Sequence, residues 1–105
     1  MKKILTFLTL FFASANAFAL DYRINLINNT SENIDRFYAS NVGTDSWEED
    51  ILGVSILRPG RYVTINLYDG TGMCRFDFKT VMEDGQVLIR RNVNVCGITD
   101  YTISE

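Results

Sequence analysis

The sequence predicts an all-β fold, a small antiparallel β-sandwich or open barrel of six or seven short strands with one disulfide. Three observations support this prediction. Short runs of alternating apolar and polar residues recur along the chain. Turn-forming residues separate these runs at intervals of about 8–12 residues. Two cysteines in a chain of 105 residues suit one small stapled domain. The same pattern predicts one short helical turn near residues 47–52.

The first nineteen residues have the three-part pattern of a secretory signal peptide. Lys2 and Lys3 precede an apolar run at 4–12, and Ala-x-Ala motifs follow at 15–17 and 17–19. The run is shorter than the roughly 20 residues of a membrane-spanning helix. We expect cleavage after Ala19 or Ala17, so that residues 20–105 form one exported domain without membrane insertion. The short dilysine start is typical of bacterial export, which predicts a periplasmic or secreted protein.

The first two strands are expected at 22–27 and 33–40. In the first run Tyr22, Ile24 and Leu26 share one face. The cluster at 28–31, Asn-Asn-Thr-Ser, indicates a turn, and the second run is read as its return strand.

The segment 41–53 is the longest irregular stretch. Ser46 and Glu49 have the spacing of a capping box, which predicts the helical turn over 47–52, and Gly53 is placed to end it. Trp47 and Ile51 are four positions apart, so the turn would place both on one face. We expect the pair to be buried at an open end of the sandwich.

The C-terminal half contains the clearest strands. Arg-Pro-Gly at 58–60 suits a type II turn, and 61–68 follows with Val63, Ile65 and Leu67 facing the core. The runs 73–82 and 86–95 flank Asp-Gly at 84–85, which favours a two-residue hairpin turn. A final strand is expected at 98–103. The predicted hairpin pairs are Phe76 with Val93, Thr80 with Ile89, and Met82 with Val87.

Cys74 and Cys96 are the only cysteines, and in an oxidising compartment they predict one intrachain disulfide. The hairpin register places Cys74 opposite Val95 instead. A bulge or the end of pairing near Asn94 is therefore needed to bring the two sulfurs together. A metal pair, a reactive thiol and an intermolecular bond are the alternatives.

Composition excludes several function classes. Without Lys2 and Lys3, eight basic residues face thirteen acidic ones, a formal charge of −5. Such a domain repels nucleic acid and anionic lipid, and it favours a basic partner. The chain has no histidine, so Ser-His-Asp triads, Cys-His pairs and histidine-bearing zinc sites are excluded. We expect no enzymatic activity.

The acidic run Asp45, Glu48, Glu49 and Asp50 is the candidate metal site, because clustered carboxylates supply the oxygen ligands that Ca²⁺ prefers. The spacing does not match an EF-hand. The alternative is a solvated helix start, where acidic residues favour the helix dipole. No cofactor other than calcium is expected.

The candidate partner-binding residues are the aromatic side chains Trp47, Tyr38 and Tyr62, since tryptophan and tyrosine are frequent in interfaces. Half-buried strand tyrosines are the structural alternative. These features favour a non-catalytic exported binding module of the inhibitor, immunity or envelope-interaction type, whose partner is another protein or an envelope component. A calcium-stabilised structural or adhesive module using the loop 45–50 is the alternative function.

The chain also contains a series of spaced motifs. They are Trp47-x-x-Asp50-x-Leu52-Gly53, Leu57-Arg58-Pro59-Gly60, Cys74-Arg75-Phe76-Asp77, Asp84-Gly85 and Cys96. This series resembles a pattern in small, mostly uncharacterised exported bacterial proteins. Glu48 stands where those proteins often have glycine. The resemblance implies one disulfide-stapled β domain and implies no activity and no functional residues.

Overall fold

A computed structural model describes residues 21–105, and the predicted signal sequence lies outside the described residues. The fold is all-β, as predicted. Its strands are β1 (Arg23–Asn29), β2 (Ile34–Asn41), β3 (Tyr62–Asn66), β4 (Arg75–Met82), β5 (Val87–Asn94) and β6 (Asp100–Ser104). The only helical element among the described residues is the 3-10 turn η2 (Val95–Gly97).

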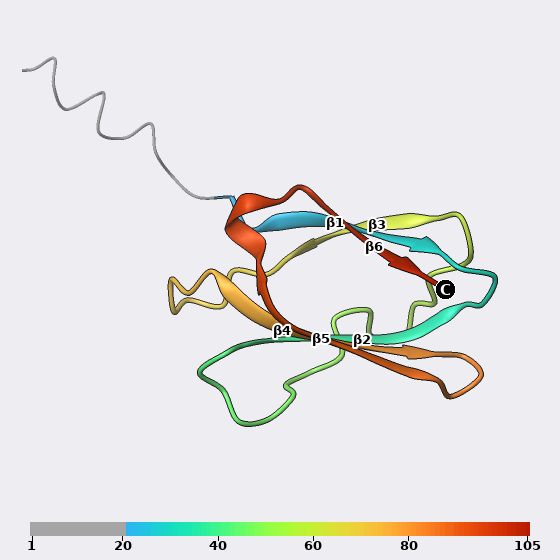
Figure 1. Ribbon diagram of the computed structural model, residues 1–105, viewed down its shortest axis with the longest axis horizontal. Helices are drawn as coiled ribbons and strands as arrows, with labels where there is room; N and C mark the ends of the chain where they lie inside the picture. Colours follow the sequence, from blue (N-terminus) through green and yellow to red (C-terminus); the bar gives the residue numbers. More distant parts are fainter. Residues whose placement is uncertain (1–20) are drawn as a thin grey trace, which may run out of the picture.

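The six strands form two three-stranded sheets that face each other as a sandwich (Figure 1). One sheet has the order β3-β1-β6 and the other has the order β2-β4-β5. Apolar side chains from both sheets fill the space between them. The largest of these fully buried apolar side chains are Phe37, Phe76, Phe78, Ile24, Leu26, Ile34 and Val95.

β1 is the central strand of its sheet and follows the predicted alternation. Tyr22, Ile24 and Leu26 are all buried. β1 pairs antiparallel with β3 and parallel with β6. The prediction of an antiparallel fold is therefore wrong for β6. The chain forms β2 to β5 between β1 and β6 and then crosses through η2 from the β2-β4-β5 sheet to the other sheet. Because of this crossing, β6 enters beside β1 and runs in the same direction.

β2 does not pair with β1, so the predicted return strand is wrong in its partner, although its position is correct. The buried Asn28 side chain accounts for this change of sheet. Its Nδ2 donates to the carbonyls of Glu32 at 2.8 Å and Leu57 at 2.9 Å, while its Oδ1 accepts from the Thr30 hydroxyl at 2.7 Å. These bonds satisfy a buried amide and hold the turn that carries the chain across the sandwich.

The β4–β5 turn contains three residues instead of the predicted two. Met82 N donates to the Gln86 carbonyl at 2.8 Å, and Gly85 N donates to the Met82 carbonyl at 2.9 Å. Gly85 has a φ of 95°, which glycine adopts at little steric cost. The extra residue shifts the register by one position near the turn. The pairs observed there are Thr80 with Leu88 and Val81 with Val87, in place of Thr80 with Ile89 and Met82 with Val87.

A bulge further along the same hairpin restores the predicted register. Phe76 pairs with Val93 as expected, whereas Phe78 pairs with Arg90. The residues between them are Asp77 on β4 against Arg91 and Asn92 on β5. Asn92 has a φ of 61°, and its N–H donates to Asp77 Oδ1 at 2.9 Å. The Asp77 carboxylate thus binds the backbone that the bulge leaves unpaired.

The disulfide between Cys74 and Cys96 is confirmed, with the two Cα atoms 5.3 Å apart. Strand pairing ends at Asn94, as the sequence required, and η2 then turns Cys96 toward Cys74. Asn94 Oδ1 accepts from Cys96 N at 3.1 Å and stabilises this turn. Closing a loop of this length stabilises the fold by roughly 3 kcal/mol in the chain-entropy model.

The segment 50–57, here called the edge segment, covers the outer edge of β2. Ile51 N donates to the Phe37 carbonyl at 2.8 Å, and Ile34 and Leu57 exchange backbone bonds as an isolated bridge. The predicted helical turn over 47–52 is wrong, because Ile51 N donates to the Phe37 carbonyl of β2 and the chain instead turns at 51–54. Gly53 does take the positive φ of a terminating position, 64°. A sheet edge with unpaired backbone groups is thereby protected.

Candidate binding face

The four acidic residues proposed as a calcium site do not gather into one. Within residues 21–105, no group of three or more acidic or cysteine side chains is arranged to hold a metal ion. Asp50 is instead bound to backbone, since its Oδ1 accepts from Phe37 N at 2.9 Å and from Leu52 N at 3.1 Å. Asp45, Glu48 and Glu49 are exposed. The arrangement therefore gives the calcium hypothesis no set of ligands.

Trp47 lies on the outer face of the β2-β4-β5 sheet and not at an open end of the sandwich. Its ring centroid is 6.5 Å from that of Tyr38 on β2. Tyr38 follows the buried Phe37, so it faces away from the core. In Figure 1 the green loop that carries Trp47 extends away from the outer side of this sheet. Ile51 packs against the core, so the predicted Trp47–Ile51 pair and the mostly buried ring are wrong; Trp47 is half-buried.

Two cations flank the Trp47 ring. Lys79 Nζ is 5.9 Å from the centroid of Trp47 and 5.2 Å from that of Tyr38. Arg91 Cζ is 5.7 Å from the Trp47 centroid. At such distances the negative face of an aromatic ring attracts a cation by about 0.5–1 kcal/mol at an exposed site. The loop carrying Trp47 is thus attached to β4 and β5 by contacts that leave part of the indole in solvent.

Asp77 orients Arg91 toward this ring. Arg91 Nη1 and Asp77 Oδ2 are 3.1 Å apart, and the Asp77 side chain is only 16% exposed. The three-residue turn described above is the reason that Arg91 points outward, because it pairs Phe78 with Arg90 and so places Arg91 beside Asp77 on the outer face. The same carboxylate therefore binds the bulge backbone and positions a cation.

The basic residues continue across the sheet. Arg36 pairs with Val81, on the same face as Lys79, and Arg75 lies two residues before Asp77 on β4. A hydrogen bond with Tyr38, followed by the charges of Tyr38 and Asp35, raises the pKa of the Arg36 guanidinium. Among the described residues, Lys79 and Arg75 form no ion pair within 4.0 Å. We call this surface the cationic–aromatic face, and its members are Arg36, Tyr38, Trp47, Arg75, Lys79 and Arg91.

Tyr62 is not part of this face. It lies on β3 in the other sheet and is 65% exposed. The structure therefore brings together two of the three predicted partner-binding residues, Trp47 and Tyr38, and separates the third.

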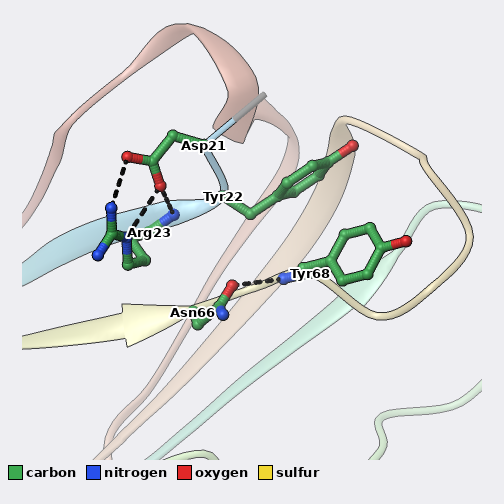
Figure 2. Close-up of a pocket in the computed structure, with 5 residues that line it drawn as sticks. All are labelled: Asp21, Tyr22, Arg23, Asn66 and Tyr68. Atoms are coloured by element: carbon green, nitrogen blue, oxygen red, sulfur yellow. Dashed lines mark hydrogen bonds and ion pairs between the residues drawn. The ribbon is translucent and has the colours of Figure 1, made fainter. Parts of the chain in front are cut away.

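A pocket of about 470 Å³ opens where β1 begins and β3 ends, lined by Asp21, Tyr22, Arg23, Asn66 and Tyr68 (Figure 2). The Tyr22 and Tyr68 rings meet edge to face with centroids 5.2 Å apart. Asp21 forms an exposed ion pair with Arg23 at 3.1 Å, and that hydrogen-bonded pair lowers the pKa of the Asp21 carboxyl. No group in the pocket has the geometry of a nucleophile beside a base. The residues that line the pocket contact one another and form no catalytic arrangement.

Sequence reasoning missed Lys79, Arg91 and Asp77. The alternation of 73–82 already placed Asp77 and Lys79 on the side opposite Phe76 and Phe78. The position of Arg91 depends on the three-residue turn, where the Asp-Gly pattern predicted two residues.

No protein-family model matches the chain, and neither the curated proteins nor the solved structures contain a significant match. The resemblance to small exported bacterial proteins therefore stays a prediction. Among residues 21–105, no helix is long and apolar enough to cross a membrane.

Proposed function

We propose that this protein is a non-catalytic binding module, exported to the periplasm or medium, that contacts its partner through the cationic–aromatic face. The observation that carries the proposal is the half-buried Trp47 ring, held between Lys79 and Arg91 on an otherwise solvent-facing sheet surface. The partner is another protein or an envelope component.

The composition of the face supports a binding role. Tryptophan, tyrosine and arginine are the residue types most enriched at energetically important positions of interfaces. Here Trp47, Tyr38 and Arg91 lie together with Lys79 on one face. Trp47 comes from a loop, while the other three come from paired strands, so a rigid sheet supports most of the contact surface.

The charge of the face differs from that of the domain. Residues 20–105 carry a formal charge of −5, which by itself favours a basic partner. Four of the eight basic residues nevertheless lie on this one face, where Asp77 is already paired with Arg91. Arg36 is already 3.7 Å from Asp35. The group that contacts the face is therefore acidic, with its carboxylates directed at Lys79 and Arg75. Such an association weakens as salt concentration rises.

Affinity capture from a bacterial envelope extract tests the proposal. Residues 20–105 are immobilised as the native sequence and as Trp47→Ala, Lys79→Glu and Tyr62→Ala, and each column is eluted with increasing salt. We expect a bound component that Tyr62→Ala retains fully. Trp47→Ala and Lys79→Glu should each reduce its recovery by about tenfold or more, as for a central interface residue.

The Tyr62→Ala column is the matched control, since it removes an exposed tyrosine from the opposite sheet. Equal recovery on all four columns would show that any bound component uses a different surface. Recovery of nothing at low salt would remove the support for a binding role in the envelope.

A further inference from the structure

The outer edge of β5 is a sheet edge without a partner strand. β5 is the last strand of the order β2-β4-β5. The Met82–Gln86 bond closes the hairpin, and antiparallel pairing alternates from there, so Leu88 and Arg90 are bonded to β4. The N–H and C=O groups of Val87 and Ile89 therefore point away from the sheet. Ile89 is 50% exposed, and within residues 21–105 no loop is bonded to this edge.

A pocket of about 250 Å³ lies beside this edge, between β5 and β6. The apolar residues of its lining are Phe78, Leu88, Ile89, Tyr101 and Ile103. Arg90 is the only charged residue of the lining, and it forms no ion pair among the described residues. The two sheets are thus not closed against each other along this side of the sandwich, and an unpaired cation lies at the opening.

The opposite edge of the same sheet shows how a segment closes such an opening. There, the edge segment pairs with β2 through backbone bonds to Phe37 and Ile34. It inserts the buried Leu57 side chain between the sheets, and the Asp50 carboxylate binds a strand N–H. Three features therefore occur together at the covered edge: strand-like pairing, an aliphatic side chain in the core, and a carboxylate at the edge.

We propose that the free edge of β5 binds an extended acidic segment of a partner protein, which adds to the sheet as a fourth strand. The segment carries an aliphatic side chain that enters the pocket next to Leu88 and, two residues away, a carboxylate that pairs with Arg90. Side chains two apart face the same side of a strand, which is why this spacing follows from the positions of Leu88 and Arg90.

Charge selects an acidic partner segment over a second copy of this chain. Edge-to-edge pairing of two β5 strands would bring Arg90 and Arg91 of one copy close to the same residues of the other, and like charges across a strand pair are destabilising. This surface is separate from the cationic–aromatic face, since the N–H and C=O groups of Val87 and Ile89 point outward at the edge while Trp47 lies over the sheet. The proposal therefore does not depend on the function proposed above.

A synthetic peptide, Ser-Thr-Val-Thr-Glu-Thr-Val-Thr-Ser, provides the test, because its valines and glutamate lie on one side of an extended strand in either orientation. Residues 20–105 are titrated with the peptide, and amide hydrogen exchange is followed by NMR. We expect slower exchange at Val87 and Ile89 with little change at Trp47. The peptide with lysine in place of glutamate should bind about tenfold more weakly.

Two variants make the test specific. Arg90→Glu should reverse the preference, so that the lysine peptide binds better, whereas Arg61→Glu changes the net charge equally at a distant turn and should leave the preference unchanged. Ile89→Pro removes one outward N–H and should abolish binding to both peptides. Unchanged exchange at Val87 and Ile89 at millimolar peptide, equal binding of the two peptides, or peptide-independent dimers seen by sedimentation would each overturn the proposal.

Discussion

The carboxylate of Asp50 accepts the backbone N–H of Phe37 at 2.9 Å, although the two residues are thirteen positions apart in the chain. Phe37 is fully buried in the core, and its carbonyl accepts from Ile51 N at 2.8 Å. Asp50, which the sequence indicated as a calcium ligand, therefore holds an irregular loop against the edge of β2. The consequences of this contact can be measured directly.

Asp50→Ala should lower the free energy of unfolding by about 1–3 kcal/mol, because the Phe37 N–H loses its acceptor in a region with little water. Asp50→Asn keeps an acceptor oxygen and should lose less. Urea denaturation measures both variants, with Glu49→Ala as the exposed neighbouring control. A melting temperature of the native protein that rises with calcium and no longer does so in Asp50→Asn would restore the metal hypothesis.

Asn28→Ala should destabilise the fold by about 3 kcal/mol, since it removes four side-chain hydrogen bonds from a fully buried site, two of them to the carbonyls of Glu32 and Leu57. Asn28→Asp should also be destabilising, because a carboxylate cannot donate to the carbonyls of Glu32 and Leu57. Thermal unfolding provides the measurement. The adjacent and exposed Asn29→Ala is the control, and equal losses at the two positions would contradict the role assigned to Asn28.

Trp47→Ala should cost about 1–2 kcal/mol, less than truncation of a fully buried aromatic residue such as Phe78, because the indole is only half-buried. Its fluorescence should be quenched more strongly by iodide than by caesium, since Lys79 and Arg91 flank the ring and attract anions. Lys79→Gln should reduce this difference. Equal quenching by the two ions would show that the cations do not lie beside the ring.

Stability should fall as the pH is lowered through the acidic range. Burial raises the pKa of Asp69, but hydrogen bonds from Thr71 and Asn41 outweigh it and hold the pKa below its ordinary value of 3.8. Hydrogen bonds from the Ser31 side chain and backbone hold the pKa of Glu105 below 4.5. A carboxyl whose pKa is lower in the folded state stabilises the fold above its unfolded pKa, and this contribution is lost as the pH falls through the folded pKa.

Melting temperatures measured from about pH 6 to about pH 2 follow this loss. Glu105→Gln and Asp69→Asn should each flatten the decrease, with the larger effect for a double variant. A melting temperature that rises below pH 3.8 would contradict the sign of these shifts.

Local pattern in the sequence was sufficient for the all-β class, for most strand positions and for the disulfide. Alternation identified the buried faces of β1 and β4, since a side chain's face in a strand depends only on its position in the run. The conflict between the hairpin register and the two cysteines correctly required a bulge or the end of pairing near Asn94, and pairing ends there, where η2 begins.

Only the tertiary structure decided which strands pair, which acids are solvated and where Trp47 lies. Strand partners depend on contacts between residues far apart in the chain, as in the parallel pairing of β1 with β6. One additional residue in the β4–β5 turn moved Arg91 to the outer face, because a shift of one position reverses the face of each side chain that follows, until the bulge at Arg91 and Asn92 restores the register. The cationic–aromatic face and the open edge of β5 both result from such long-range placement, so residue types and local spacing did not reveal them.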